Sequence, residues 1–352
     1  MKKIFKGLLI LLLVIVLAVG GLFGFLTVTE FKPAPVEPLG FFGQAAEELP
    51  ALQEGQHLRI LSWNIGYAGL GAESDFFMDG GENSMSADKA TVQRYLDGIR
   101  GQLGVGDYDL VILQEVDTDS KRSYRIDETQ PLSIGQSVHA LNYSCPFVPI
   151  PWPPIGRVHS GLLTTSEYRI DESARIALPC PFSWPLSTAN LKRCLLVSRL
   201  PIEGSDRELV LVNLHLEAYD DGAGKIAQTQ QLMGLLQEEY EKGNYVIAGG
   251  DFNQTFPGSL DVYPMIDPSY WTPGVLEEAS LPEGFSYVYD LAAPSCRLLN
   301  QPYDPGDTAH TQYYIIDGFI VSPNVTVEAA DTLDLSFADS DHNPVCMSVV
   351  LG

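Results

Sequence analysis

The sequence predicts an α/β fold rich in strands, preceded by one transmembrane helix. Eight short apolar runs, enriched in β-branched and aromatic residues, have the length of strands. Two longer stretches, 87–98 and 225–242, have helical spacing, and Gly243 supplies a stop for the second. Residues 7–26 are uncharged and almost wholly apolar. The strand candidates, in order, are LRILSWN, DLVILQEV, SGLLTTS, RCLLVSRL, ELVLVNLHL, YVIAGGDFN, YYIIDGFIV and PVCMSVVL.

The N-terminal apolar segment is long enough to cross a membrane, because 20 residues at about 1.5 Å each span about 30 Å. Lysines precede it and Glu30 follows it, so the positive-inside rule places residues 1–6 in the cytoplasm. Residues 7–27 are then a signal anchor in the cell membrane, and the rest lies outside. The alternative is a signal peptide cleaved near residues 18–20, which would give a secreted protein.

The sequence that follows the apolar segment predicts a tether and then one folded domain. Residues 28–57 are rich in Pro and Glu and lack periodicity, so the folded domain is expected over 58–352. Five cysteines are scattered without a CxxC pair, which argues against a zinc cluster. Cys145 and Cys180, both in Cys-Pro-Phe loops, are candidates for a disulfide in an exported protein; buried or free thiols are the alternative.

The chain is strongly acidic. Its 352 residues include 21 Lys and Arg against 45 Asp and Glu, a net charge of −24. Without Lys2, Lys3 and Lys6, which precede the apolar segment, 18 basic residues face 45 acidic ones and the net charge is −27. We expect no tight non-specific binding of nucleic acid, because that affinity comes mainly from Lys and Arg on phosphates. If the protein acts on phosphates, something other than its own net charge must attract them.

Polar side chains close nearly every predicted strand. Any one of them has a structural explanation as a turn former, a cap or a buried hydrogen-bonding group. Long Gly-, Pro- and Asp-rich regions at 66–86, 119–159 and 254–310 are expected to shape a binding site around them. The residues concerned are Asn64, Glu115, His215, Asp251, Asn253, Asp317, Asp341 and His342.

This set of residue types predicts metal-assisted chemistry on a phosphoester. Carboxylates that converge on one rim repel one another unless a cation lies among them. Oxygen ligands without Cys favour a hard ion, Mg²⁺ first, with Mn²⁺ or Ca²⁺ as alternatives. Two histidines add groups that titrate near neutral pH and can donate protons or hydrogen bonds to phosphoryl oxygens. Together they predict hydrolysis of a phosphoester.

The motifs WNIGY, LVILQEV, NLHLEA, GGDFNQ, IIDGF and SDHNPV, in this order, resemble the endonuclease/exonuclease/phosphatase superfamily. That superfamily includes deoxyribonucleases, sphingomyelinases and inositol-polyphosphate phosphatases. The likeness covers about 58–351. It implies a four-layered α/β sandwich, with two mixed β-sheets face to face, helices outside them and an active site at one sheet edge.

The resemblance also implies a role for each site residue. Glu115 would be the principal metal ligand, with Asn64 and Asp341 at or beside the metal. His342 would act on the attacked phosphate, and Asp317 would orient His342.

The remaining site residues would complete the reaction. Asp251 would activate or orient the attacking water or assist the leaving group, and Asn253 would hydrogen-bond a non-bridging oxygen. His215 matches a second family histidine that hydrogen-bonds the phosphate. Arg193 is a candidate phosphate-binding residue, with an ordinary surface arginine as the alternative. His159 stands where deoxyribonucleases carry a carboxylate, so it would partner His215, contact substrate or do neither.

We therefore expect a membrane-anchored, extracytoplasmic, Mg²⁺-dependent enzyme that hydrolyses a phosphodiester or phosphomonoester by in-line attack of water. Its phosphoester substrate would be a lipid headgroup, a nucleotide, a nucleic acid or an inositol phosphate. A nuclease acting on extracellular DNA is one alternative. A non-catalytic binding module is another, although such a module has no reason to keep the whole set of residues. No exposed aromatic hairpin for lipid contact is evident in the sequence.

Overall fold

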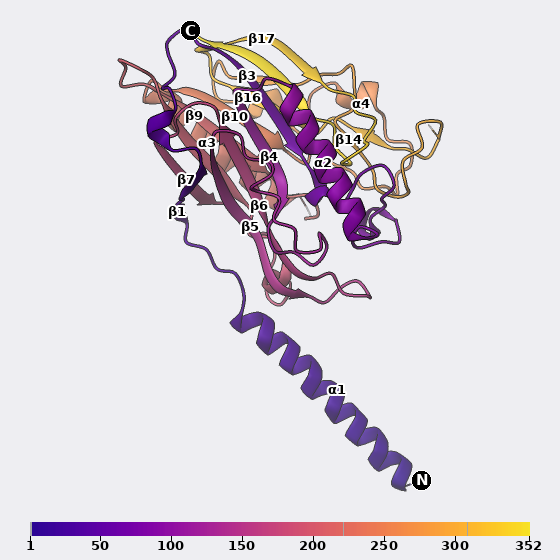
Figure 1. Ribbon diagram of the computed structural model, residues 1–352. Helices are drawn as coiled ribbons and strands as arrows, with labels where there is room; N and C mark the ends of the chain where they lie inside the picture. The colour runs from indigo at the N-terminus through magenta and orange to yellow at the C-terminus, as the bar shows by residue number, and fades with distance from the viewer. Residues whose placement is uncertain (1, 221, 308) are drawn as a thin grey trace.

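The computed structural model describes residues 2–220, 222–307 and 309–352. Two seven-stranded mixed sheets pack face to face, and one long helix covers the outer face of each, α3 on the first and α2 on the second (Figure 1). The α/β sandwich with four layers is therefore confirmed. The helices of the described residues are α1 (Lys2–Val28), α2 (Lys89–Val105), α3 (Ala223–Glu241) and α4 (Ser259–Val262).

The first sheet has the order β1 (Val36–Pro38), β7 (Glu172–Ala177), β8 (Cys194–Pro201), β9 (Glu208–His215), β10 (Tyr245–Asp251), β16 (Asp317–Val321), β13 (Ser286–Val288). The second has the order β17 (Val325–Thr332), β18 (Val345–Leu351), β3 (His57–Asn64), β4 (Leu110–Asp117), β6 (Gly156–Ser166), β5 (Gln136–Val148), β2 (Phe41–Gly43). Two short ladders pair β11 (Gln254–Thr255) with β12 (Gly274–Val275) and β14 (Cys296–Arg297) with β15 (Tyr313–Tyr314). Single turns of 3₁₀ helix lie at Ala46–Glu48, Gly66–Ala68, Phe77–Asp79, Leu186–Ala189 and Glu278–Ser280.

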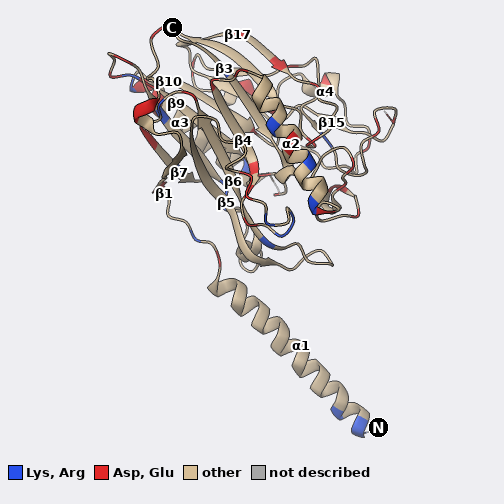
Figure 2. Cartoon of the chain, in the orientation of Figure 1, with Lys and Arg blue, Asp and Glu red and all other residues tan. Residues whose placement is uncertain are grey.

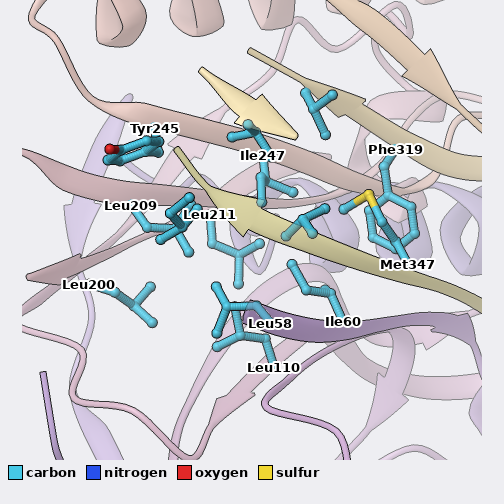
Figure 3. Close-up of a cluster of buried hydrophobic side chains, with 14 of the residues drawn as sticks. Leu58, Ile60, Leu110, Leu200, Leu209, Leu211, Tyr245, Ile247, Phe319 and Met347 are labelled. Carbon is cyan, nitrogen blue, oxygen red and sulfur yellow. The ribbon is translucent and has the colours of Figure 1, made fainter. Parts of the chain in front are cut away.

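The space between the sheets is filled by side chains from both (Figure 3). Along β10, Tyr245 and Ile247 point into this space, whereas Val246 and Ala248 point toward α3. Successive side chains of a strand face opposite sides, so a strand covered on both faces has to be apolar throughout. This is why the sequence shows continuous apolar runs where a half-exposed sheet would show alternation.

Helix α2 begins where its sequence indicates and ends later. The Asp88 carboxylate accepts a hydrogen bond from the Thr91 backbone N–H at 2.8 Å, which caps the first turn. The helix continues past the expected end at residue 98 because Ile99 and Leu103 extend its buried face against the second sheet.

Two regions are more regular than expected. The segment 28–57, expected to be a tether, contains β1 and β2, which pair with β7 and β5 at the edges of the two sheets. Strand β5 occupies 13 residues of the region 119–159, which was expected to be irregular. Strands of three residues are too short to show a period, and β5 carries few large apolar residues.

Helix α1 projects away from the sandwich, and only its C-terminal end contacts it (Figure 1). It is long and apolar enough to cross a membrane. Its charges lie at its N-terminal end (Figure 2). At the other end Leu26 is buried, Trp184 Nε1 donates to Thr27 Oγ1 at 3.0 Å, and Lys192 pairs with Glu30 at 2.9 Å.

The five cysteines are free. Cys145 is buried and Cys180 is exposed, so the alternative of unpaired thiols describes them.

The inter-sheet core predicts where the fold is sensitive. Ile247→Ala, in the centre of that core, should lower the free energy of unfolding by about 2–5 kcal/mol, because it removes buried methyl groups and leaves a cavity. Ile226→Ala is the matched control, since this isoleucine is 59% exposed on α3. This substitution should change the free energy of unfolding by less than about 0.5 kcal/mol. Urea titration of both variants measures this free energy. Equal losses of stability in the two variants would contradict the assignment of Ile247 to the core.

Candidate active site

Strand register brings three predicted site residues together in the first sheet. Asp251, the last residue of β10, lies opposite His215 of β9 and Asp317 of β16. The inward side chains of β10 are those of alternate residues such as Tyr245 and Ile247, so Asp251 ends that inward row. The three side chains therefore face the space between the sheets, where the apolar core stops.

Two glycines let β10 place Asp251 there. A Cβ atom on Gly249 would collide with the ring of Phe319. Gly250 has φ of 146°, and a Cβ on it would collide with the carbonyl oxygen of Leu214 on β9. The pair of glycines before the aspartate is thus required by close packing.

The second sheet supplies Asn64 and Glu115. Asn64 ends β3, next to Gln114 of β4 in the strand register. The pairing of β4 with β6 shifts between Leu113 and Val116, and Glu115 within this bulge has φ of 56°. A bulge re-aims side chains, and a non-glycine residue with positive φ is strained by about 1–3 kcal/mol. The strain accompanies a carboxylate that lines the pocket.

Hydrogen bonds lock the two sheets together beneath the site. Gln114 Nε2 donates to Asn213 Oδ1 at 2.9 Å, and Asn213 Nδ2 donates to the carbonyl oxygens of Leu113 and Leu163 at 3.1 and 3.0 Å. Asn213 belongs to β9, whereas its three partners belong to the second sheet. This bridge fixes the distance between the strand ends that carry the site.

Asn64 connects the carboxylates of the two sheets. Its Nδ2 donates to Asp251 Oδ2 at 3.0 Å and to Glu115 Oε1 at 3.3 Å. Its Oδ1 accepts from the Gly66 backbone N–H at 3.0 Å, which fixes the orientation of the amide. Asn64 therefore stands as a donor to carboxylates. A role as metal ligand, the expectation from the sequence, would use the oxygen that Gly66 now engages.

His342 is held by a buried chain of hydrogen bonds. Its Nδ1 lies 2.8 Å from Asp317 Oδ2, which also accepts from Ser295 Oγ at 2.7 Å. Trp63 Nε1 donates to the His342 carbonyl oxygen at 2.8 Å. The other ring nitrogen, Nε2, lies 3.9 Å from Asp251 Oδ2 and 3.9 Å from Asp341 Oδ2. The arrangement presents His342 Nε2 to the pocket.

His215 and Asn253 flank Asp251 on its other side. His215 Nε2 lies 3.4 Å from Asp251 Oδ2, and the buried His215 Nδ1 has no hydrogen-bond partner among the described residues. The Asn253 backbone N–H donates to Asp251 Oδ1 at 2.8 Å, and Asn253 Nδ2 donates to the Leu216 carbonyl at 2.8 Å. Asp251 is therefore the centre of the cluster.

Burial and mutual repulsion shift the pKa values of these carboxyls. Burial, reinforced by Asp317, raises the pKa of Asp251 to about 7. Burial, reinforced by Glu115, raises the pKa of Asp341 to about 6. His342 offsets only part of this effect, and a hard divalent cation with oxygen ligands would supply further positive charge. The donor set fits such an ion, although its identity does not follow from the donors.

The pKa values of the two histidines shift in opposite directions. Burial opposes the charge of His342, but Asp317, Cys296 and Asp341 together outweigh burial and raise the pKa of His342 well above its usual value. Burial, together with Arg193, lowers the pKa of His215 well below its usual value. Two imidazoles in one site are thus suited to different proton states.

Arg193 is not a surface residue. It is buried and lines the pocket, its Nη1 donates to the His215 carbonyl at 3.1 Å, and its Nε lies 3.3 Å from Glu217 Oε2. Glu217 is a residue of the motif NLHLEA whose role the sequence did not indicate.

His159 lies apart from the other candidates. Its Nδ1 is 2.6 Å from Thr118 Oγ1, and it does not line the pocket that holds His215. The next residue of β6, Ser160, points the other way and does line that pocket. The structure thus brings all the candidates except His159 to one place.

Arg122 is a site residue that sequence reasoning missed. Its guanidinium lies 3.7 Å from the centre of the Tyr67 ring, 2.9 Å from Asp117 Oδ1 and 3.9 Å from Glu115 Oε2. It comes from the region 119–159, in which no motif marks it.

The site opens into a pocket of about 470 Å³. The three long regions expected to shape a binding site contribute to its walls, for example through Phe76, Tyr143 and Trp271. All eight residues at the predicted strand ends except Asp317, which lies behind His342, line it. The pocket can therefore admit a phosphate group beside Glu115, Asp251, Asp341 and both histidines.

Solved structures support the fold. An endonuclease/exonuclease/phosphatase protein from Bacteroides vulgatus is 16% identical, with 84% of this chain and 100% of that chain covered and a TM-score of 0.53. One from Beutenbergia cavernae is 17% identical, with 84% and 72% covered and a TM-score of 0.52. One from Bacteroides thetaiotaomicron is 17% identical, with 85% and 99% covered and a TM-score of 0.51. At these identities the likeness shows the fold alone.

No curated protein matches the chain. A model of the Endonuclease/Exonuclease/phosphatase family, whose members are metal-dependent phosphoesterases and nucleases, matches residues 61–342. This range spans β3 to the histidine before β18 and holds every predicted site residue. The chain therefore belongs to the Endonuclease/Exonuclease/phosphatase family.

Proposed function

We propose that the protein is a membrane-anchored, Mg²⁺-dependent phosphoesterase whose catalytic domain lies outside the cytoplasm. The observation that carries the proposal is the Asp317–His342 pair, which presents the second imidazole nitrogen, Nε2, to Asp251 and Asp341 inside the pocket. A site kept only for binding has no need of a histidine oriented by a buried carboxylate.

Glu115 and Asp341 would hold the cation. Both carboxylates line the pocket, and repulsion from Glu115 contributes to the raised pKa of Asp341. A bound divalent ion would neutralise charge on the phosphate oxygens and lower the pKa of a water molecule. Asn64, which donates to Glu115 and Asp251, would keep the two carboxylates in position.

The surrounding side chains would carry the reaction. Asp251, the centre of the cluster, would accept a proton from the attacking water as its oxygen bonds to phosphorus. The bond from phosphorus to the leaving oxygen would break on the opposite side, and that oxygen would depart and take up a proton from solvent. His342 Nε2 and the Asn253 amide would hydrogen-bond the non-bridging oxygens. His215 would hydrogen-bond the phosphate from the opposite side of Asp251, near the leaving oxygen. Arg193 would hold His215 through its backbone carbonyl.

Location outside the cytoplasm rests on α1. Its apolar length fits a membrane, and its lysines lie at the end remote from the domain (Figure 2). The charge at the N-terminal end supports an N-terminus inside and a catalytic domain outside.

The first test is metal dependence with a generic phosphodiester, bis-p-nitrophenyl phosphate. Hydrolysis should fall to background in EDTA and return with Mg²⁺ or Mn²⁺. His342→Ala should lower kcat/KM at least about 10³-fold because it removes the group facing the phosphate. His57→Ala, an exposed histidine paired with Glu328, should stay within about twofold. Full activity in EDTA, or unchanged turnover of His342→Ala, would contradict the proposal.

A second variant tests how His342 is oriented. Asp317→Asn should lower kcat about 10³-fold with little change in KM, because an amide cannot stabilise the imidazolium and favours the wrong tautomer. The pH profile should shift as well, since Asp317 raises the pKa of His342, and its loss should move the histidine titration to lower pH. Asp331→Asn, an exposed residue of β17, serves as control. An unchanged pH profile would show that the carboxylate does not act through His342.

Chemical labelling of one thiol tests the membrane topology. Cys180 is exposed, whereas the other four cysteines are buried. A membrane-impermeant maleimide added to intact cells should therefore label the protein, and Cys180→Ser should abolish the labelling. The labelled chain should stay with membranes after a carbonate wash. Labelling only after permeabilisation would overturn the orientation, and labelled protein in the medium would support cleavage of the segment.

A further inference from the structure

The pocket has an apolar arm that leads to the membrane helix. Tyr143, Val148, Ile155, Val158 and Ala189, which we call the apolar arm, line the same pocket as the catalytic residues. These five residues also belong to the hydrophobic cluster that buries Leu26 of α1. One continuous apolar surface therefore connects the end of the anchor to the phosphate site.

Beside this arm, the protein exposes large apolar side chains. In the β5–β6 hairpin Ile150 is 67% and Trp152 90% exposed, and near Leu186–Ala189 Trp184 is 62% and Leu186 66% exposed. We call these four residues the membrane-proximal face. The hairpin carries an exposed tryptophan, so the expectation of no aromatic hairpin was wrong; its Pro-rich sequence gives no strand-like signal.

Trp184 of this face contacts α1, so with α1 across the membrane, as proposed above, the face would lie at the membrane surface. The Trp184 ring lies 6.0 Å from that of Phe23, and its Nε1 donates to Thr27 Oγ1. The apolar run of α1 ends at Leu26, so this contact coincides with the end of the membrane-spanning segment. Tryptophan is the residue enriched at membrane interfaces, since its ring is apolar and its N–H polar.

We propose that the substrate is a phosphoester lipid of the same membrane, whose hydrocarbon chain occupies the apolar arm while its phosphate reaches the Asp251 cluster. The proposal rests on the proposed phosphoesterase function and names its substrate class. It commits to a lipid because the arm is continuous with the anchor.

The apolar arm would lower the energetic cost of moving a lipid substrate from the membrane to the phosphate site. Ser160, beside Arg122 at the polar end, and Ile155 of the arm, which directly precedes β6, are five residues apart, about 17 Å at 3.3 Å per residue of extended chain. A lipid phosphate that travels this far from the bilayer draws methylenes with it, and each one exposed to water costs about 0.8 kcal/mol. An apolar wall along the path removes most of that cost.

The charges that line the pocket are compatible with a ligand that carries one phosphate and unfavourable for the binding of a long polyanion. Arg122 pairs with Asp117, and Arg193 pairs with Glu217, so both guanidiniums are largely neutralised. With a net charge of −27 beyond the first 27 residues, the domain offers little to a chain of phosphates.

The test compares lipid and soluble substrates with the full chain reconstituted in vesicles of phosphatidylcholine, phosphatidylethanolamine and phosphatidylglycerol. Released headgroup products are measured by mass spectrometry, and bis-p-nitrophenyl phosphate is the soluble reference. Ala189→Trp narrows the arm from a half-buried position, and Ile150→Ser combined with Trp152→Ser alters the exposed hairpin without touching the core. Each should lower the ratio of lipid to soluble hydrolysis at least tenfold. Val105→Ser, 78% exposed at the end of α2, should leave that ratio unchanged.

The outcomes separate the two proposals. If the wild-type protein hydrolyses neither substrate with Mg²⁺, the proposed phosphoesterase function fails. If it hydrolyses the soluble diester but none of the three lipids, the lipid inference is overturned and the function stands. Unchanged ratios in both variants, or faster hydrolysis of plasmid DNA than of lipid, would also overturn the inference.

Discussion

The site depends on one structural constraint. Two β-sheets face each other, and the side chains of each strand alternate between its two sides. Inward rows that are apolar in the middle of β9, β10 and β16 end in His215, Asp251 and Asp317. The same alternation that builds the core thus brings the proposed catalytic groups to its edge. Asn213, which bonds to the opposite sheet just beneath them, holds the two edges at a fixed separation.

Placing so many carboxyls at the edge of an apolar core is unfavourable for folding and useful for chemistry. Burial raises the pKa of Asp251 and Asp341, and the strained φ of Glu115 adds a further cost. The apolar layers beneath, such as Ile247 and Phe319, supply the stabilisation that tolerates these costs. Features that local energetics disfavour therefore cluster where the proposed reaction takes place.

The attachment of α1 fixes the orientation of the domain relative to this apolar helix. A flexible tether would let the pocket face any direction. Here β1 and β2 pair with the two sheets, and Leu26, Thr27 and Glu30 contact the domain, so the anchor and the pocket are parts of one structure. With α1 across a membrane, as proposed, this geometry would affect what the pocket can bind as well as where the protein resides.

The sequence by itself determined the strands that are apolar throughout, the membrane-length helix and the residue types at the strand ends. Those features are local, since a strand buried on both faces must be apolar and a helix crossing a membrane must be long and uncharged. The motifs also indicated the family, and hence the sandwich. Only the tertiary structure decided that Arg122 joins the site, that His159 lies apart, that the segment 28–57 pairs with both sheets, and that apolar residues of the pocket wall pack against α1. Each of these depends on contacts between residues distant in sequence, and short strands, single arginines and Pro-rich hairpins carry no period from which such contacts can be inferred.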